Sequence, residues 1–153
     1  MNINETEKKI CAVTGSNGFV GSHLVDYLLE KGHAVKCIVR KGSNLKWLEG
    51  KNVEIYNCGL DDIEALKDIF SDVDYIFHIA GVVKALKPEG YFKGNVETSR
   101  NVLEAAKSSK SLRKILITSS MAATGPAITG GEVDENSPLK PIEPYGYSKV
   151  EQE

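Results

Sequence analysis

The sequence predicts an α/β domain built on a doubly wound parallel sheet, and two observations carry that prediction. Short apolar runs, each of a length that suits one strand, alternate along the chain with stretches whose apolar residues recur at helical spacing. A glycine-rich turn at 14–21 joins the first apolar run to the first helical stretch. Alternation of this kind is typical of a parallel sheet with helices on both faces.

The elements are expected in alternation after a disordered N-terminal extension, residues 1–9. Strands are expected near 10–14, 34–39, 53–56, 73–79 and 113–119. Helices are expected near 19–31, around 45–48 as a short piece, over 62–70 and over 94–109. Asp61 and Glu64 resemble a capping box before the helix at 62–70. Right-handed crossovers then give the strand order 3-2-1-4-5, with the ligand crevice at the carboxyl ends of strands 1 and 4.

The first strand, turn and helix carry the strongest functional signal. Residues 10–13 are apolar, and from Val20 apolar residues recur at helical spacing until Gly32. Three glycines lie in the turn between them: Gly15, Gly18 and Gly21. The first permits a tight turn, the second lets the backbone approach a pyrophosphate, and the third lets the helix lie close on the strand. Phosphates would then meet the helix N-terminus, although a glycine-rich turn that binds nothing is the alternative.

Length, charge and cysteine usage exclude several classes of function. The 153 residues suit one domain, and 19 basic against 21 acidic residues give no electrostatic case for nucleic acid or a membrane surface. No apolar run approaches the ~20 residues of a membrane span, and residues 1–9 do not resemble a signal peptide. We therefore expect a soluble, cytoplasmic protein. Cys11, Cys37 and Cys58 are interpreted as reduced core thiols, and no metal site is expected.

Arg40 indicates which dinucleotide the glycine turn would bind. It follows Val39 at the end of the second predicted strand, about 20 residues after the glycines. An acidic residue at this point bonds the ribose 2′-hydroxyl of NAD, whereas an arginine neutralises a 2′-phosphate. With Lys41 and Lys46 nearby, Arg40 favours NADP over NAD. The alternative is an exposed basic turn.

Tyr145 and Lys149 form a second signal near the end of the chain. They stand four residues apart and share one face of a helix that begins there. A nearby ammonium favours the phenolate and so lowers the tyrosine pKa from about 10 towards the range of proton exchange with an alcohol or carbonyl. Ser120, at the end of the last predicted strand, would reach the same substrate oxygen. Such a pair also arises by chance on helices, and its order after the glycine turn is what makes it informative.

Together these segments resemble the extended short-chain dehydrogenase/reductase superfamily, also called the NAD-dependent epimerase/dehydratase family, whose cofactor domain is a Rossmann fold. Residues 39–50, VRKGSNLKWLEG, are most similar to dihydroflavonol-reductase-like enzymes, which generally use NADP. The resemblance also rests on TGSNGFVG at 14–21, HIAG at 78–81, NVETSRNVLEAA at 95–106, TSSMAATG at 118–125, VDENSPLKP at 133–141 and PYGYSK at 144–149.

The resemblance implies hydride transfer between a nicotinamide and a small carbonyl or alcohol substrate. Tyr145 would be the general acid/base, Lys149 would lower its pKa and bind the nicotinamide ribose, and Ser120 would bond the reacting oxygen. His78 is interpreted as a packed strand-end residue rather than a proton donor. Besides Tyr145 and Lys149, the cofactor contacts that the resemblance implies are Thr14, Gly15, Asn17, Gly18, Phe19, Val20, Gly21, Arg40, Leu60, Ile79, Ala80, Gly81 and Asn95.

The chain departs from the family pattern in three places. Gly59 stands where the family has an aspartate that bonds the adenine amino group, so either adenine affinity is weaker or Asp61 substitutes. Glu97 replaces a glycine and is expected to disturb helix packing. Thr124 replaces a tyrosine found in many epimerases, which favours a reductase.

The chain ends at Glu153, whereas the family continues through further strands and a substrate domain. We therefore expect a fragment rather than a natural truncation, inactive alone, with a marginal last helix that does not hold Tyr145 and Lys149 in catalytic geometry. The resemblance implies a homodimer through two helices in the complete protein. Two other functions stay open: a nucleotide-sugar epimerase or dehydratase that retains NAD, and a non-catalytic sensor that binds a dinucleotide.

Overall fold

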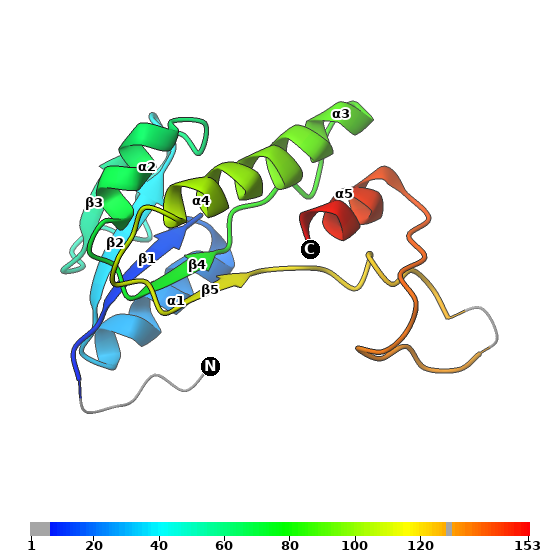
Figure 1. Ribbon diagram of the computed structural model, residues 1–153, viewed down its shortest axis with the longest axis horizontal. Coiled ribbons are helices and arrows are strands. Elements are labelled where there is room, and N and C mark those ends of the chain that lie inside the picture. Colours follow the sequence, from blue (N-terminus) through cyan, green and yellow to red (C-terminus); the bar gives the residue numbers. More distant parts are fainter. Residues whose placement is uncertain (1–6, 128–129) are drawn as a thin grey trace. The chain divides into compact units, whose positions relative to one another are not determined.

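The computed structural model describes residues 7–127 and 130–153, which form a five-stranded parallel sheet with helices (Figure 1). The strand order is β3-β2-β1-β4-β5, as predicted. The elements are β1 (Ile10–Thr14), α1 (Phe19–Glu30), β2 (Ala34–Val39), β3 (Glu54–Asn57), α2 (Ile63–Phe70), β4 (Tyr75–His78), α3 (Pro88–Tyr91), the π-helical segment η1 (Phe92–Glu97), α4 (Thr98–Ala106), β5 (Lys114–Ile117) and α5 (Pro144–Gln152).

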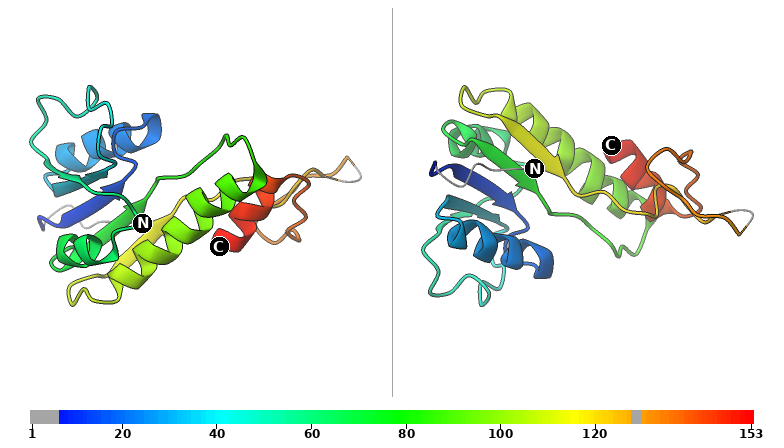
Figure 2. Two further views of the ribbon diagram at one scale, coloured as in Figure 1. Left: turned by 90° about the horizontal axis from the view of Figure 1, so that it is seen from above. Right: turned by 90° about the horizontal axis from the view of Figure 1, so that it is seen from below.

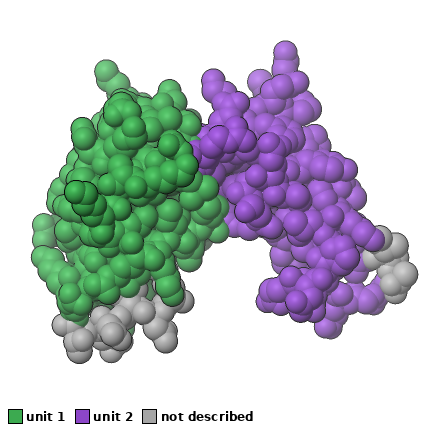
Figure 3. Space-filling model, in the orientation of Figure 1, with its two compact units in different colours: residues 1–80, 101–117 green, residues 81–100, 118–153 purple. Residues whose placement is uncertain are grey.

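The chain divides into two compact units, coloured separately in Figure 3. The sheet unit consists of residues 1–80 and 101–117 and holds all five strands, α1, α2 and most of α4. The helical unit consists of residues 81–100 and 118–153 and holds α3, η1, the first turn of α4 and α5. The glycine turn lies in the first unit, and Tyr145 and Lys149 lie in the second.

The core of the sheet unit has two layers because successive strand residues point to opposite faces. On β1, Cys11 and Val13 pack with α1, whereas Ala12 packs with α2 and α4 on the other face (Figure 2). All three side chains are fully buried. Burial on both faces explains why the inner strands β1 and β4, together with β2, are mostly apolar runs.

The cysteines are core thiols, as the sequence predicted. All three are free, with Cys11 and Cys37 fully buried and Cys58 half-buried. Burial raises the pKa of Cys11 to about 12 and that of Cys37 to about 11. These thiols therefore stay protonated near neutral pH.

The expected capping residue of α2 and the expected start of the long helix were wrong. Asp62, not Asp61, caps α2, because its Oδ1 accepts a hydrogen bond from the Ala65 amide at 3.1 Å. The long helix expected over 94–109 begins at α3, where Pro88 occupies the first turn, runs through η1 and ends at Ala106. Proline suits that position because its missing N–H has no partner there in any case.

Residues 45–48 form hydrogen-bonded turns rather than the expected short helix, with the Leu45 carbonyl accepting from both Leu48 and Glu49. Of the expected N-terminal extension, residues 1–6 lie outside the described part of the chain. Lys9 is buried, and its amide donates to Nδ1 of His33 at 3.3 Å. Within the described ranges, no helix has the length and apolar character needed to cross a bilayer.

Candidate functional site

The glycine turn is shaped by close backbone approaches that exclude side chains. Gly15 has a φ of 67°, and a Cβ there would lie 2.8 Å from the amide nitrogen of Ala80. A Cβ on Gly21 would collide with the carbonyl oxygen of Gly15. The Gly18 amide donates to that same oxygen at 3.0 Å and closes the turn. The sequence therefore folds α1 directly onto the turn that precedes it, and two of the three glycines are required by space or by φ.

The start of α1 is open to solvent. Gly18 is the N-cap of the helix and is exposed, as are Phe19 and Val20, although both are large apolar residues. Among the residues that the structure describes, no side chain forms a capping hydrogen bond at the start of α1. An uncapped helix N-terminus beside a backbone without Cβ atoms is a place where an anionic group such as a pyrophosphate fits.

Buried polar groups join the ends of β1 and β4. The Thr14 hydroxyl lies 2.7 Å from Nδ1 of His78 and accepts from the Ala80 amide at 3.2 Å. Thr14 and His78 are fully buried, so both act in packing at this point. These contacts hold Ala80 beside Gly15. The sequence predicts that the segment of Ile79, Ala80 and Gly81 passes close to the cofactor.

The loop after β2 is attached to the glycine turn. The Asn17 amide group donates to the Asn44 carbonyl at 3.2 Å, and the Asn44 side chain accepts from the Lys46 amide at 2.9 Å. Arg40 is exposed directly after β2, and within the described part of the chain no carboxylate pairs with it. The loop that follows Arg40 is thereby attached to the glycine turn.

A carboxylate occupies the space of the side chain that Gly59 lacks. A Cβ on Gly59 would collide with Oδ1 of Asp61, so the Asp61 side chain lies over position 59. Asp61 is exposed, and its neighbour Leu60 packs against the core while its carbonyl accepts from the Asn101 side chain at 3.0 Å. Leu60, which the sequence predicts as a cofactor contact, is half-buried and packs against the core on one side.

In the helical unit, α5 forms a nine-residue helix and holds both Tyr145 and Lys149, whereas the sequence led us to expect a marginal helix. Buried polar contacts stabilise it. Lys149 is 4% exposed, and its ammonium donates to the Thr118 carbonyl at 2.7 Å and to Oε1 of Gln152. Burial lowers the pKa of Lys149, and the Glu153 carboxylate opposes this shift.

A second set of contacts fixes the turn of α5 that carries Tyr145. A Cβ on Gly146 would lie 2.8 Å from Cβ of Pro141 and would collide with the Ala122 carbonyl, so only glycine lets α5 pack there. The rings of Tyr145 and Tyr91 are 5.9 Å apart. The Ser148 hydroxyl donates to the Tyr145 carbonyl at 2.7 Å and accepts from Asn95 at 2.9 Å.

Asn95 is fully buried in η1, and both polar atoms of its side-chain amide form hydrogen bonds within the chain. Its oxygen accepts from the Val82 amide at 2.7 Å, and its nitrogen donates to the Val82 carbonyl at 3.1 Å as well as to Ser148. A Cβ built on Gly81 would lie 3.2 Å from Oδ1 of the same Asn95 side chain. Asn95 therefore links the chain after β4 to α5. Glu97, expected to disturb packing, is exposed at the end of η1.

Ser120 lies in a segment that is attached to α5. The Thr118 carbonyl accepts from Lys149, and the Ser119 hydroxyl donates to the Glu153 carboxylate. The Ser120 hydroxyl is half-buried and accepts from the Ala122 amide at 3.2 Å. The helical unit thus collects Ser120, Tyr145 and Lys149, the three residues expected to carry proton transfer.

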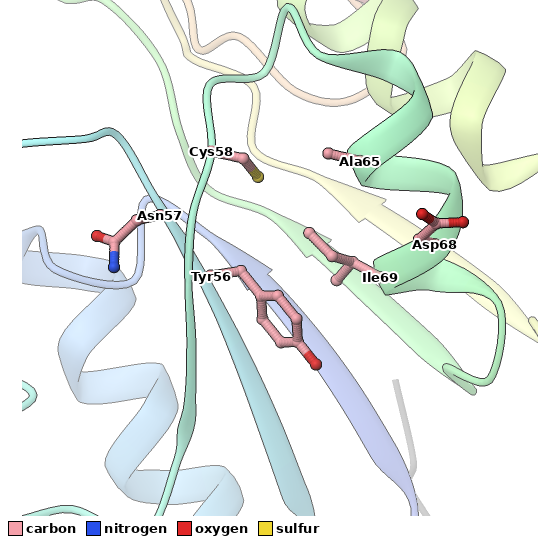
Figure 4. Close-up of a pocket in the computed structure, with 6 residues that line it drawn as sticks. All are labelled: Tyr56, Asn57, Cys58, Ala65, Asp68 and Ile69. Carbon is pink, nitrogen blue, oxygen red and sulfur yellow. The ribbon is translucent and has the colours of Figure 1, made fainter.

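One hollow of the sheet unit holds none of the expected site residues. It has a volume of about 310 Å³ and lies where the end of β3 faces α2 (Figure 4). Its lining combines apolar and polar side chains: Tyr56, Asn57, Cys58, Ala65, Asp68 and Ile69. Burial and the nearby carboxylates of Asp62 and Asp61 raise the pKa of the Cys58 thiol, which argues against a reactive cysteine there.

Residues 11–153 match the family model described as the NAD dependent epimerase/dehydratase family. Among curated relatives, cinnamoyl-CoA reductase 1 of Arabidopsis thaliana is 37% identical over 76% of this chain and 35% of its own length. UDP-glucose 4-epimerase of Thermotoga maritima, solved with UDP-glucose, is 29% identical with a TM-score of 0.82, over 92% of this chain and 48% of its own.

A short-chain dehydrogenase/reductase superfamily protein of Agrobacterium tumefaciens, solved with bound NAD, is 27% identical with a TM-score of 0.80 over 94% of this chain and 42% of its own. The chain thus spans less than half the length of these relatives. The match to the family model covers both the glycine turn and the helix that carries Tyr145 and Lys149. The chain belongs to the NAD-dependent epimerase/dehydratase family, part of the extended short-chain dehydrogenases/reductases.

Proposed function

We propose that this chain is the cofactor-binding part of an NADP-dependent oxidoreductase that interconverts a small carbonyl and an alcohol. The observation that carries the proposal is the buried ammonium of Lys149. Lys149 lies one helical turn after Tyr145, and the Thr118 carbonyl fixes its ammonium. A buried cation at this distance along a helix stabilises a phenolate. Lys9 and Lys36 are also buried, but each lies beside an aspartate, whereas Lys149 donates to the neutral oxygens of Thr118 and Gln152. A buried lysine held in this way favours a role in proton transfer.

The residues of the sheet unit fit a dinucleotide. Gly15 and Gly21 make a cradle that a Cβ would fill, and the uncapped start of α1 suits a pyrophosphate. Arg40 and Lys46 supply positive charge for a ribose 2′-phosphate, which is the reason for favouring NADP over NAD. Bound there, the nicotinamide dinucleotide would supply or accept the hydride.

The helical unit would supply the proton chemistry. During reduction Tyr145 gives its phenolic proton to the substrate oxygen, and during oxidation the phenolate takes the proton back. Lys149 stabilises the phenolate, and the Ser120 hydroxyl holds the reacting oxygen. Asn95 acts through Ser148, which it bonds, and so orients the turn of α5 that carries Tyr145.

The proposal is tested by cofactor binding and by turnover. This chain, titrated with NADPH and then NADH while Trp47 fluorescence is followed, is expected to bind NADPH more tightly. A chain that binds neither would exclude a working dinucleotide site. In the complete enzyme, Tyr145→Phe is expected to reduce turnover by about 10²–10⁴-fold with little change in cofactor affinity, because only the proton donor is removed. Full activity in that variant would remove Tyr145 from the mechanism.

The similarity to UDP-glucose 4-epimerase supports a second candidate, a nucleotide-sugar epimerase or dehydratase. Such an enzyme regenerates its NAD within each catalytic cycle and has no need to release it. Cofactor that stays with the complete protein through purification would favour this candidate. Turnover that depends on added NADPH would favour the reductase.

A further inference from the structure

Lys149 is held by a partner that the sequence motifs do not include. Gln152 lies one turn further along α5, is 6% exposed, and its Oε1 accepts from the Lys149 ammonium. Because an ammonium can only donate, the amide oxygen must face Lys149 and the amide nitrogen must face away. That nitrogen donates to the Ser99 hydroxyl on α4 at 2.7 Å. Ser99 is 2% exposed, so a buried chain of hydrogen bonds runs from α4 to Lys149.

This chain of contacts is neutral except for Lys149 itself. The carboxylate of Glu153, the C-cap residue of α5, acts to raise the pKa of Lys149 and accepts from Ser119. Tyr145 lies one turn before Lys149 on α5. Glu151 is exposed and lies 4.0 Å from the Arg100 guanidinium on α4. Gln152 therefore gives the buried ammonium a second acceptor without adding a counter-charge. Burying the Lys149 ammonium or the Gln152 amide without a hydrogen-bond partner would cost free energy.

We propose that Gln152 is a positioning residue that Ser99 orients, and that it fixes the Lys149 ammonium at the Thr118 carbonyl and keeps it protonated. Its consequence for catalysis rests on the proposed function, because the charge on Lys149 would set how readily Tyr145 releases its proton. Its structural part does not, because it concerns only the protonation of Lys149 in this chain. Burial alone would favour the neutral amine, and the two acceptors offset that tendency.

The test is the titration of Lys149 in this chain, followed by NMR of ¹³Cε-labelled lysine, with the signal assigned by Lys149→Arg. Gln152→Met keeps the length of the side chain and removes the acceptor, so the Lys149 midpoint is expected to fall by about one pH unit. Gln152→Glu adds a negative charge and is expected to raise it. Ser99→Ala frees the amide of Gln152 and is expected to lower the midpoint by less.

Glu151→Gln is the matched control, because it changes a charge next to Gln152 on the exposed face and is expected to leave the Lys149 midpoint unchanged. A merely structural Gln152 would lower stability in Gln152→Met without lowering the Lys149 midpoint. If Gln152→Met does not fold, Ser99→Ala tests the same chain of contacts from its other end. A Lys149 midpoint that is the same in the wild type and in every folded Gln152 and Ser99 variant would overturn the proposal.

The pH profile of turnover separates this proposal from the proposed function. In alcohol oxidation, Gln152→Met is expected to move the rising limb to higher pH, because Tyr145 loses the stabilisation of its phenolate. A Lys149 midpoint that shifts in this chain, together with no turnover by the complete enzyme, would reject the oxidoreductase and retain the positioning role. Turnover with an unshifted Lys149 midpoint would retain the oxidoreductase and reject the positioning role of Gln152.

Discussion

Arg40 is exposed after β2, and the loop that follows it is attached to the glycine turn through Asn17 and Asn44. Arg40→Asp is expected to weaken NADPH binding by about 10–100-fold, because a carboxylate repels the 2′-phosphate that a guanidinium would bond. NADH binding is expected to strengthen. Both affinities are measured by Trp47 fluorescence. Lys93→Asp, which makes the same change of charge at an exposed position of η1, controls for net charge. An unchanged NADPH/NADH ratio in Arg40→Asp would sink the role of Arg40.

Asp61 offers a substitute for the aspartate that the family has at the position of Gly59. Its carboxylate fills the space over position 59 at the end of β3, and we propose that it bonds the adenine amino group. The wild type should therefore bind NADPH about tenfold more tightly than the analogue in which hypoxanthine replaces adenine, as expected for a hydrogen bond to a charged group. Asp61→Ala should bind the two equally, and Asp68→Ala, on the exposed side of α2, should keep the preference. A preference that survives in Asp61→Ala would assign adenine recognition elsewhere.

At the scale of elements, periodicity located β1, β2 and β4 because each is a mostly apolar run that is buried. The edge strands β3 and β5 are shorter and partly exposed, so their apolar signal is weaker. Periodicity failed where a tertiary contact decides the local structure. Asp61 does not cap α2 because its side chain lies over Gly59, and the adjacent Asp62 caps instead. The π-helical turns of η1 could not be predicted, since the buried bonds of Asn95 to Val82 and Ser148 join residues far apart in the sequence. Residues 45–48 are too few to sustain a helix between turns.

The junction of α1 and β2 makes the fold sensitive to acid. His33 is buried, and its Nδ1 accepts from the Lys9 amide, so the ring must be neutral there. Burial and the nearby Lys9 lower the pKa of His33 below its usual value. The unfolded chain therefore binds a proton more readily, and stability is expected to be full above about pH 6.5 and to fall as the pH drops below it, down to the lowered pKa of the folded state.

Urea unfolding between pH 7.5 and pH 5 measures this sensitivity. His33→Gln retains an acceptor that does not titrate, so its loss of stability on acidification is expected to be smaller than that of the wild type. His23→Gln is the matched control, because His23 is exposed on α1 and contacts the Phe19 carbonyl and ring there. Equal pH dependence in the wild type and His33→Gln would show that other groups cause the acid sensitivity.

At the scale of the whole molecule, the residues that would do chemistry and those that support them differ in how far the sequence reveals them. Tyr145, Lys149 and the glycines could be found because each belongs to a local pattern. Gln152 could not, because its partner Ser99 lies 53 residues away and either residue alone is unremarkable in a helix. The need for glycine at position 146 likewise follows from Ala122, which is distant in the sequence, and from Pro141, which together leave no room for a side chain there. A local motif therefore indicates the candidate reactive groups, whereas the residues that position those groups depend on contacts between distant parts of the sequence.

The division into a sheet unit and a helical unit predicts that dinucleotide affinity and proton chemistry can be damaged separately. Gly18→Val has an ordinary φ of −83°, and its Cβ would meet only the Gly15 carbonyl at 3.2 Å, so the sheet unit is expected to fold. The added side chain would keep a pyrophosphate from the backbone, and NADPH affinity in the Trp47 titration is expected to fall by more than tenfold, about 1.4 kcal/mol.

Gly146→Val makes the opposite change. Its side chain would collide with the Ala122 carbonyl and displace α5, so the contacts of Lys149 with Thr118 are expected to be lost while the sheet unit is unchanged. NADPH affinity is then expected to stay within about tenfold of the wild type, because the cradle and Arg40 are intact. Backbone amide spectra report which unit each variant disturbs. Tight NADPH binding by Gly18→Val would show that affinity does not reside in the sheet unit. Loss of all binding in Gly146→Val, with the amide signals of the sheet unit unchanged, would show the same. Dinucleotide binding and proton chemistry would then have to be assigned to the chain as a whole.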